Sequence, residues 1–216
     1  MILLVFAKAA SAADISPATL CDHAIAAAET QLHLPKGILA AVGRAESGRP
    51  DHVGRIHPWP YTINAEGTGR FLPSKAAATA AVLSLKRRGV QSIDVGCVQV
   101  NLLHHPSAFA SLEQAFDPVA NTFYGAWFLS ELYGELKSWP AAIAAYHSRT
   151  PDIGASYATR VMAIWTGAPL RSALLKRAKR PSSPYGSWPP AGVSYGALPP
   201  MDFAYRAFAS PSRGDR

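Results

Sequence analysis

The spacing of apolar positions predicts a chain built mostly of helices. The first segment keeps its apolar residues at helical intervals, at Leu20, Ile25, Ala28 and Leu32. Ser16 followed by Pro17 supplies an N-cap and a proline at the first helical position. This helix is therefore expected to run from residue 17 to about residue 34.

A second helix is expected to begin at Pro35, because apolar residues recur after it at Ile38, Leu39 and Val42. Gly48 and Pro50 end this helix. Glu46 therefore falls in its last turn, at the edge of whatever surface the helix packs against.

Two short β-prone segments, residues 61–63 and 70–72, flank a glycine-containing turn at residues 64–69 and predict a small hairpin. Residues 92–95 are typical of a brief extended segment, and residues 96–101 of a turn that enters a helix. Further helices are expected at residues 75–88 between Ser74 and Gly89, at 118–136 after Asp117, at 139–147, and from 151 to about 165.

Composition supports one α-rich globular domain followed by a tail. The chain has 216 residues, of which 49% are hydrophobic and 16% charged, and much of the apolar content is alanine, the best helix former. We expect the domain at residues 14–169. Seven prolines lie between Pro181 and Pro211, so residues 170–216 are expected to be a disordered tail that buries too little apolar surface to fold.

The net charge of +7 is concentrated in that tail, which carries eight basic and two acidic residues. The remaining chain, residues 1–169, carries thirteen basic and twelve acidic residues. A near-neutral body argues against nucleic-acid binding. The basic tail can lie on anionic surfaces such as cell-wall polymers or lipid headgroups.

Residues 1–13 resemble the end of a secretory signal, with an apolar run at residues 2–7 and the small-x-small pattern Ala10-Ser11-Ala12. The basic n-region is missing, which leaves open a start further upstream or an N-terminus that is no signal at all. No other stretch approaches the ~18 apolar residues of a transmembrane helix. Cys21 and Cys97 form a disulfide in an oxidising compartment or remain two buried thiols, and the sequence leaves both open.

Four short blocks carry the candidate chemistry. They are Ala45-Glu46-Ser47-Gly48, Trp59-Pro60-Tyr61-Thr62-Ile63-Asn64, Gly96-Cys97-Val98-Gln99-Val100-Asn101 and Ala144-Ala145-Tyr146-His147-Ser148. In this order and at these separations, the chain from Leu20 to Trp165 resembles the SLT-type lytic transglycosylases of the goose-lysozyme-like superfamily. The second block and the run from Ser92 to Cys97 resemble the specialised members that accompany secretion systems and flagella.

The resemblance implies a mainly α, lysozyme-like domain with a small hairpin beside an open groove, acting on peptidoglycan in the periplasm. It also implies a role for each matching residue. Glu46 matches the catalytic glutamate, and Ser47 the residue that hydrogen-bonds near the substrate's N-acetyl group. Gln99 and Asn101 match residues that line the glycan groove, and Tyr146 the tyrosine whose hydroxyl lies near the catalytic carboxyl. Tyr61 and Asn64, in the second block, are expected to contact substrate.

This sequence departs from the family at His147-Ser148-Arg149, where Asn-Ala-Gly is usual, so the local turn there is in doubt. The other residues also have plainer interpretations that the sequence leaves open. Gln99 and Asn101 can cap a turn, and Tyr146 can belong to the core. Trp59, Tyr61 and Phe71 either stack on sugars or pack the hairpin.

Glycosidic cleavage near neutral pH needs a proton on the leaving oxygen, which a carboxyl supplies if apolar surroundings keep it protonated. Glu46, among small and apolar neighbours, is expected to be that acid. Ordinary hydrolysis also needs a second carboxylate, and Asp51, Glu66 and Asp94 have no convincing spacing. Asp94 is expected to be structural, holding the turn that presents Gln99.

With one carboxyl, the substrate's own N-acetyl group takes the part of the missing carboxylate, and the product is a 1,6-anhydro sugar formed without water. No cofactor is expected. His104-His105 does not predict a metal site, because adjacent helical residues point about 100° apart and no further ligand sits at a suitable spacing. The competing hypotheses are a hydrolytic muramidase and a non-catalytic peptidoglycan-binding scaffold.

Overall fold

The computed structural model describes residues 16–168. The predicted signal at residues 1–13 and the predicted tail at residues 170–216 lie outside this part of the chain. The described helices are α1 (Pro17–Gln31), α2 (Ile38–Ser47), α3 (Lys75–Arg87), α4 (Leu112–Ala115), α5 (Pro118–Leu136), α6 (Trp139–His147) and α7 (Pro151–Thr166). The strands are β1 (Gly48–Pro50), β2 (Ile56–Pro58), β3 (Thr62–Ala65), β4 (Thr68–Phe71), β5 (Ile93–Val95) and β6 (Val100–Asn101).

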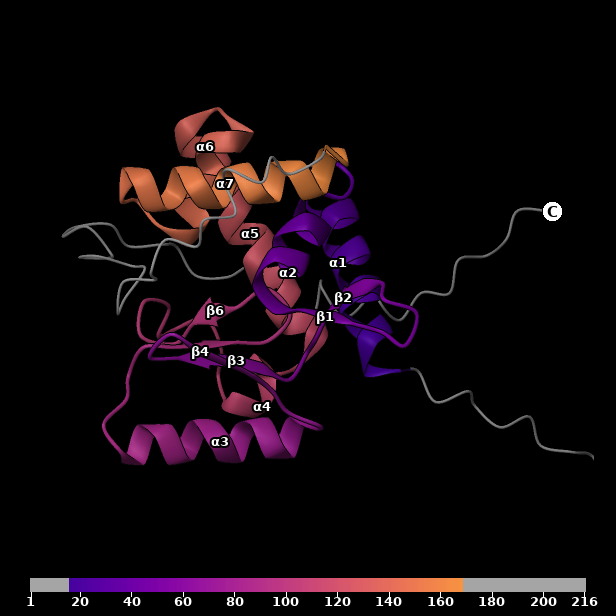
Figure 1. The fold of residues 1–216 in the computed structure, drawn as a ribbon. Helices are drawn as coiled ribbons and strands as arrows, with labels where there is room; N and C mark the ends of the chain where they lie inside the picture. Colours follow the sequence, from indigo (N-terminus) through magenta and orange to yellow (C-terminus); the bar gives the residue numbers. More distant parts are fainter. Residues whose placement is uncertain (1–15, 169–216) are drawn as a thin grey trace, which may run out of the picture.

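The fold has a helical part and a sheet part, each with its own apolar core. Figure 1 shows α6 and α7 at one end of the molecule, α3 at the other, and the sheet between them. The helical core is formed by α1, α2, α5, α6 and α7, whereas α3 and α4 cover the sheet. This mainly helical architecture is the lysozyme-like class that the sequence predicts.

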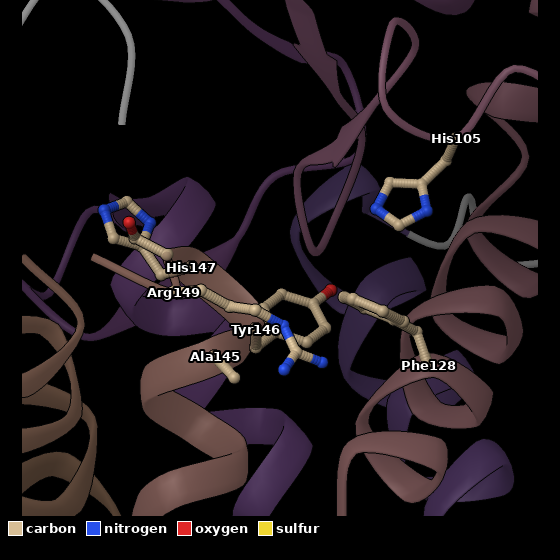
Figure 2. A pocket seen from close by; sticks show the side chains of 7 residues that line it. His105, Phe128, Ala145, Tyr146, His147 and Arg149 are labelled. Carbon is tan, nitrogen blue, oxygen red and sulfur yellow. The ribbon is translucent and has the colours of Figure 1, made fainter. Parts of the chain in front are cut away.

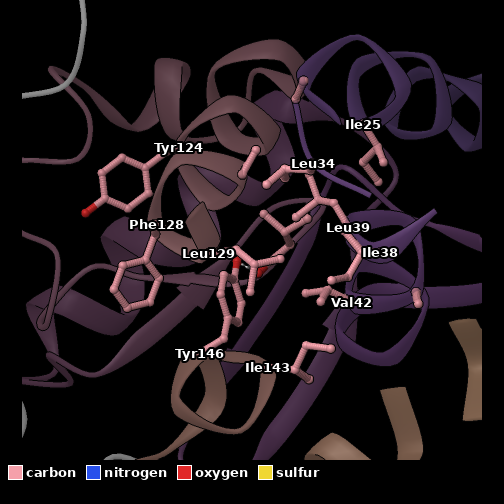
Figure 3. Close-up of a cluster of buried hydrophobic side chains, with 14 of the residues drawn as sticks. Ile25, Leu34, Ile38, Leu39, Val42, Tyr124, Phe128, Leu129, Ile143 and Tyr146 are labelled. Atoms are coloured by element: carbon pink, nitrogen blue, oxygen red, sulfur yellow. Dashed lines mark hydrogen bonds between the residues drawn. The ribbon is translucent and has the colours of Figure 1, made fainter. Parts of the chain in front are cut away.

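The core of the helical part confirms the apolar face predicted for α2. Ile38, Leu39 and Val42 are fully buried and lie in one cluster with Leu129 of α5 and Ile143 of α6 (Figure 3). Full burial of one such aliphatic side chain contributes roughly 1.5–3 kcal/mol. The helix that carries Glu46 is therefore held firmly along one side.

Helix α2 begins three residues later than predicted because a buried carboxylate determines its start. Glu29 of α1 is 7% exposed and accepts the backbone N–H groups of Gly37, Leu39 and Ala40 at 2.7, 2.8 and 3.1 Å. Gly37 has φ 84°, which breaks the helix before it. A negative charge at a helix N-terminus is favourable, since the helix dipole is positive there.

Most other boundaries follow the predicted capping signals. The side chains of Ser74 and Asp117, which the sequence indicated, accept backbone N–H groups in the first turn of the helices that follow them. Ser138, which was not singled out, caps α6 in the same way. The long helix α5 and the helix α6 have the limits expected from the sequence. Capping of this kind stabilises a helix by about 1 kcal/mol.

The predicted hairpin is confirmed, and it forms part of a larger sheet. Strands β3 and β4 pair from Thr62↔Phe71 to Ala65↔Thr68, and β5 and β6 extend the sheet in the order β4-β3-β5-β6. The prediction of a helix entered at residues 96–101 is wrong. That segment turns back and pairs as β6, with Asp94 opposite Asn101, because it can complete the edge of the sheet.

A disulfide joins Cys21 of α1 to Cys97, which resolves the alternative that the sequence left open. Both cysteines are fully buried and lie 76 residues apart in the chain. The bond ties the first helix to the turn between β5 and β6. Within residues 16–168, none of the helices combines the length and apolarity needed to cross a membrane.

Replacing both Cys21 and Cys97 with serine should lower the free energy of unfolding by about 2–5 kcal/mol, because the unfolded chain regains the freedom of a long closed loop. Chemical denaturation of the variant against the oxidised wild type measures the difference. Reduced wild-type protein should unfold between oxidised wild type and the variant, because the variant also buries two serine hydroxyl groups in the apolar core. Equal midpoints for oxidised wild type and variant would contradict the expectation.

Candidate active site

The turn at residues 96–99 has an unusual backbone conformation, which hydrogen bonds to neighbouring segments hold in place. Gly96 has φ 84° and Gln99 has φ 50°, a left-handed conformation that is uncommon for a residue other than glycine. The Gln99 amide Nε2 donates to the carbonyls of Thr62 and Gly96 at 3.1 and 2.9 Å. Asn121 of α5 accepts the Val98 N–H at 3.1 Å and donates to the Val95 carbonyl at 3.0 Å. These bonds offset the strain of the turn.

Ser47 fastens the end of α2 to this turn. Its hydroxyl donates to the Cys97 carbonyl at 2.5 Å and accepts the Trp59 N–H at 3.2 Å, and the residue is 1% exposed. The predicted contact between Ser47 and the substrate's N-acetyl group therefore needs correction. A hydroxyl buried to this degree and bonded to the protein is not presented to a glycan.

Tyr146 reaches the same turn from α6. Its hydroxyl donates to the Val98 carbonyl at 3.0 Å, and the residue is 8% exposed. Burial raises the Tyr146 pKa well above its ordinary value, and the nearby Glu46 charge raises it further. Tyr146 is therefore both a core residue and a neutral neighbour of Glu46, so the two interpretations of this tyrosine are compatible.

Glu46 lies in the last turn of α2, as predicted, with a side chain that is 10% exposed. Its Oε1 atom lies 3.6 Å from Nδ1 of His147. Burial raises the pKa of Glu46, but His147 beside the carboxylate, the close Tyr157 hydroxyl and the Arg160 charge outweigh burial and lower it. The expectation of purely apolar surroundings that keep the carboxyl protonated is therefore wrong.

Two of these neighbours, Tyr157 and Arg160, were not singled out from the sequence. Tyr157 is 3% exposed and its ring stacks on His147 with centroids 4.3 Å apart, and the Arg160 guanidinium lies 5.3 Å from the Tyr157 centroid. Tyr157 and Arg160 stand three residues apart on a helix that was predicted. The i, i+3 spacing already placed them on one face, but nothing in the pattern indicated that this face meets Glu46.

Two small, partly open hollows adjoin this site, and they share His105, Phe128 and Tyr146 in their linings. Gln99 and Asn101 line one hollow, whereas His147 and Arg149 line the other. Figure 2 shows Tyr146 between His147 on one side and Phe128 and His105 on the other. We call these two neighbouring hollows the trough. Glu46 lines neither of them, but His147, which lines one, lies 3.6 Å from the Glu46 carboxyl.

A family model described as the transglycosylase SLT domain matches residues 23–156. The chain belongs to this family. No curated protein and no solved structure matches the chain. SLT-domain proteins are lytic transglycosylases, lysozyme-like enzymes that act on peptidoglycan, and this chain is an enzyme of that class.

Asn64, Asp94 and Asn101 form a polar network beneath the trough of this SLT domain. The Asp94 carboxylate accepts the amide of Asn64 at 2.8 Å and that of Asn101 at 2.7 Å. The Asn101 Oδ1 atom accepts the backbone N–H groups of Leu103 and His104. Asp94 is structural, as predicted, although it holds Asn101 rather than Gln99. The Asn101 amide is thus committed to the protein itself, and the Gln99 Nε2 atom likewise, whereas the buried Oδ1 atom of Asn64 has no hydrogen-bond partner among the described residues.

His105 is 8% exposed, and the Tyr124 hydroxyl lies 2.8 Å from its Nδ1 atom. Burial lowers the pKa of His105 to about 4, with a further contribution from the His104 charge, so the ring is neutral at pH 7. Within residues 16–168 no group of three or more His, Cys, Asp or Glu side chains could hold a metal ion.

The aromatic residues of the second block mainly pack the hairpin. Trp59 donates its ring N–H to the Leu72 carbonyl at 2.8 Å and meets Tyr61 edge to face. The Arg49 guanidinium lies 4.4 Å from the centroid of the Trp59 ring. Phe71 is 46% exposed and offers the more accessible aromatic surface.

The three carboxylates considered as a second catalytic group have other surroundings. Asp51 accepts the backbone N–H groups of Val53 and Arg55 and the Arg55 side chain, and these bonds outweigh desolvation and lower its pKa to about 2. Glu66 is exposed in the hairpin turn, and Asp94 is bonded as described above. None of them is among the groups that shift the Glu46 pKa.

Substitution of Gly125 of α5 tests whether the contact between Tyr146 and the turn is needed for stability and activity. A Cβ atom at Gly125 would lie 2.5 Å from Val98 Cγ2 and 2.8 Å from the Tyr146 hydroxyl. Gly125→Ala should therefore destabilise the domain by about 1–3 kcal/mol through overpacking and displace Tyr146, with loss of peptidoglycan cleavage. Thermal unfolding and turnover of digested sacculi measure the two effects.

Gly134→Ala on the same helix is the matched control, because a Cβ atom there has no neighbour within 4 Å. Alanine should stabilise an exposed helical position by about 0.5–1 kcal/mol and leave activity unchanged. Equal behaviour of the two variants would show that the close packing at Gly125 has no functional consequence.

Proposed function

We propose that this enzyme cleaves the β-1,4 bond between N-acetylmuramic acid and N-acetylglucosamine, with Glu46 as the single acid and base and a 1,6-anhydro sugar as product. The observation that carries the proposal is the setting of Glu46. It is a nearly buried carboxyl whose influential neighbours are an imidazole, a phenol and a guanidinium, and not a second carboxylate.

In the first step Glu46 donates its proton to the glycosidic oxygen as the bond to the anomeric carbon breaks. The carbonyl oxygen of the muramic N-acetyl group bonds to that carbon and gives an oxazolinium-type intermediate. In the second step the Glu46 carboxylate takes the proton of the C6 hydroxyl, and the C6 oxygen replaces the acetyl oxygen at the anomeric carbon. Glu46 is then protonated again, and no water has been consumed.

The polar neighbours of Glu46 suit the stage between these two steps. Once its proton has left, Glu46 is a carboxylate with His147 at 3.6 Å and Arg160 close enough to lower its pKa. Favourable charges of this kind stabilise the charged form of an acid. The acid step is the harder one in the empty site, since the same neighbours make Glu46 reluctant to keep its proton.

The trough is the proposed glycan site. We infer that the acetamido and lactyl groups lie against Gln99 and Asn101, and that Tyr146 orients the intermediate, because Gln99 and Asn101 line one of the hollows and Tyr146 lines both. Tyr61, directly before β3, and Asn64 on β3 are further proposed substrate contacts. Ser47 is not among the proposed substrate contacts, because its hydroxyl is hydrogen-bonded to the Cys97 carbonyl and the Trp59 N–H.

We propose that the enzyme acts in the periplasm, after removal of the signal-like segment at residues 1–13. Its substrate is peptidoglycan, and a disulfide such as Cys21–Cys97 persists in an oxidising compartment. The domain limits 14–169 remain part of this proposal. Recruitment to a secretion system or flagellum through the basic tail, residues 170–216, is a further part of it and rests on the sequence alone.

Product analysis on purified sacculi tests the proposal. Wild-type enzyme should release muropeptides with 1,6-anhydro ends, which mass spectrometry distinguishes from reducing ends because they are lighter by one water. Glu46→Gln should lower turnover by about 10²–10⁴-fold, the range that a general acid contributes, while the folded protein still binds glycan.

Glu66→Gln is the matched control, since it makes the same chemical change at an exposed carboxylate in the hairpin turn. Its activity should equal that of wild type. Reducing ends in the wild-type digest would instead identify a hydrolytic muramidase, and sacculi left intact by the wild-type protein would identify a binding scaffold. Full activity of Glu46→Gln would exclude Glu46 as the acid.

A further inference from the structure

Arg149 stands where the family pattern has glycine, and the structure gives this difference a place in the trough. The turn that carries it is regular, because α6 ends at His147 and the Ser148 N–H donates to the Ala144 carbonyl at 2.9 Å. The Thr150 N–H then donates to the Ser148 hydroxyl at 3.1 Å. The doubt about the local turn is thereby removed. What distinguishes arginine from glycine here is a long side chain with a permanent positive charge.

Glu135, near the C-terminal end of α5, holds the Arg149 guanidinium in place. The two terminal nitrogens of Arg149 donate to the two carboxylate oxygens of Glu135 at 2.8 and 2.5 Å. Two parallel bonds of this kind fix the plane of a guanidinium as well as its position. Arg149 therefore lines its hollow, together with Tyr146, in a defined orientation (Figure 2).

The lining of the trough has a charge that suits an anion. Of the described residues that line the two hollows, Arg149 alone carries a permanent charge, and none is an aspartate or a glutamate. His105, which both hollows share, is neutral at pH 7 because burial lowers its pKa to about 4. A carboxylate that enters the hollow of Arg149 therefore meets a cation and no like charge in its walls.

The pairing with Glu135 orients Arg149 and leaves it within reach of a ligand. The side chains of Arg149 and Glu135 are 31% and 49% exposed. Solvent screens an ion pair with this exposure, so the two side chains attract each other only weakly. A ligand carboxylate in the hollow therefore loses little by competing with Glu135 for the guanidinium or by sharing it.

The proposed position of the glycan brings a carboxylate toward Arg149. The lactyl group is proposed to lie against Gln99 and Asn101, which line one hollow, whereas Arg149 lines the other. Tyr146 lines both, so a substituent that extends from the first hollow past Tyr146 reaches Arg149. In muramic acid the lactyl arm either ends in a free carboxylate or continues as an acidic stem peptide.

We propose that Arg149 is a specificity-determining residue that binds a carboxylate on the lactyl arm of N-acetylmuramic acid. This inference rests on the proposed function and names its substrate class, which is glycan whose muramic acid residues carry a negative charge on this arm. Two sources share this chemistry, the free lactyl carboxylate of peptide-free strands and the carboxylates of an attached stem peptide. Arg149 takes no part in proton transfer, since a guanidinium keeps its charge.

Two matched pairs of soluble muramyl glycan fragments test the proposal with the full chain. In one pair the lactyl arm is a free carboxylate or its methylamide. In the other pair it carries an alanyl-glutamate dipeptide, either with both carboxylates free or with both amidated. Wild-type kcat/KM should be about tenfold higher for the charged member of at least one pair, the usual effect of a hydrogen bond to a charged group. The pair that shows this preference identifies the source of the carboxylate.

Substitutions at Arg149 should change this preference in a graded way. Arg149→Gln should abolish the preference for the charged fragment. Arg149→Lys should keep part of it, because lysine retains the charge and lacks the paired N–H groups. The wild-type preference should also fall as salt is added, since the guanidinium is partly exposed. A purely structural arginine would produce neither the discrimination between fragments nor its salt dependence.

Two control variants separate substrate binding from the fold and from net charge. Glu135→Gln breaks the same ion pair and keeps the cation, so it should retain the preference for the charged fragment. Arg88→Gln makes the same change of charge at an exposed arginine directly after α3. Its preference should equal that of wild type.

Equal wild-type kcat/KM within both pairs would overturn the proposal, and this comparison decides even if the variants fail to fold. A preference that survives in Arg149→Gln would overturn it too, as would equal losses of preference in Arg149→Gln and Glu135→Gln, which would give Arg149 a structural role only. Anhydro products formed at equal rates within both pairs would keep the proposed reaction and reject the role of Arg149. If the wild-type protein cleaves no fragment, the proposed function fails, and the Kd values of the same pairs still measure the carboxylate preference.

Discussion

The turn at residues 96–99 is the constraint on which the rest of the site depends. Cys97 joins it to α1 through the disulfide, Ser47 joins it to α2, Asn121 to α5 and Tyr146 to α6. The Gly96 N–H donates to the Thr62 carbonyl at 2.9 Å and connects the turn to β3. Four helices and the sheet thus converge on four residues, and the relative positions of Glu46 and Tyr146 follow from that convergence.

This arrangement explains why the turn needs an unusual backbone. At Gly96 a Cβ atom would lie 2.3 Å from the Asn121 amide, so only glycine lets α5 approach the chain closely enough to bond to Val95 and Val98. Gln99 accepts a left-handed conformation and secures it with its own side chain. The motif at residues 96–101 resembles a substrate-binding motif in the sequence. In the structure its first task is to hold the helices and the sheet together at this turn, and its residues line the trough because the trough lies beside the turn.

The sequence predicted best what is determined locally. The limits of α5 and α6, the caps at Ser74 and Asp117, and the hairpin are each set by residues within a few positions of one another. Strand β6 was missed because its pairing partner, β5, decides its conformation. The late start of α2 was missed for the same reason, since Glu29 belongs to another helix.

The candidate site shows the same limit. Glu46 and Tyr146 were identified through their motifs, but the dry surroundings expected for Glu46 were inferred from its neighbours along the chain alone. Its neighbours in space, His147, Tyr157 and Arg160, come from α6 and α7 and are polar. The disulfide likewise depended on whether two distant segments meet, which spacing along the sequence cannot reveal.

In the proposed reaction Glu46 acts first as acid and then as base, and these two roles make opposite demands on its surroundings. An apolar pocket would help it hold a proton before cleavage and would penalise the carboxylate that must exist afterwards. Cations alone would stabilise the carboxylate after cleavage and would make the carboxyl lose its proton before cleavage. Glu46 has both influences, burial that raises its pKa and His147 and Arg160 that lower it. His147 stands where the family pattern has asparagine, and it places an imidazole nitrogen 3.6 Å from the Glu46 carboxyl.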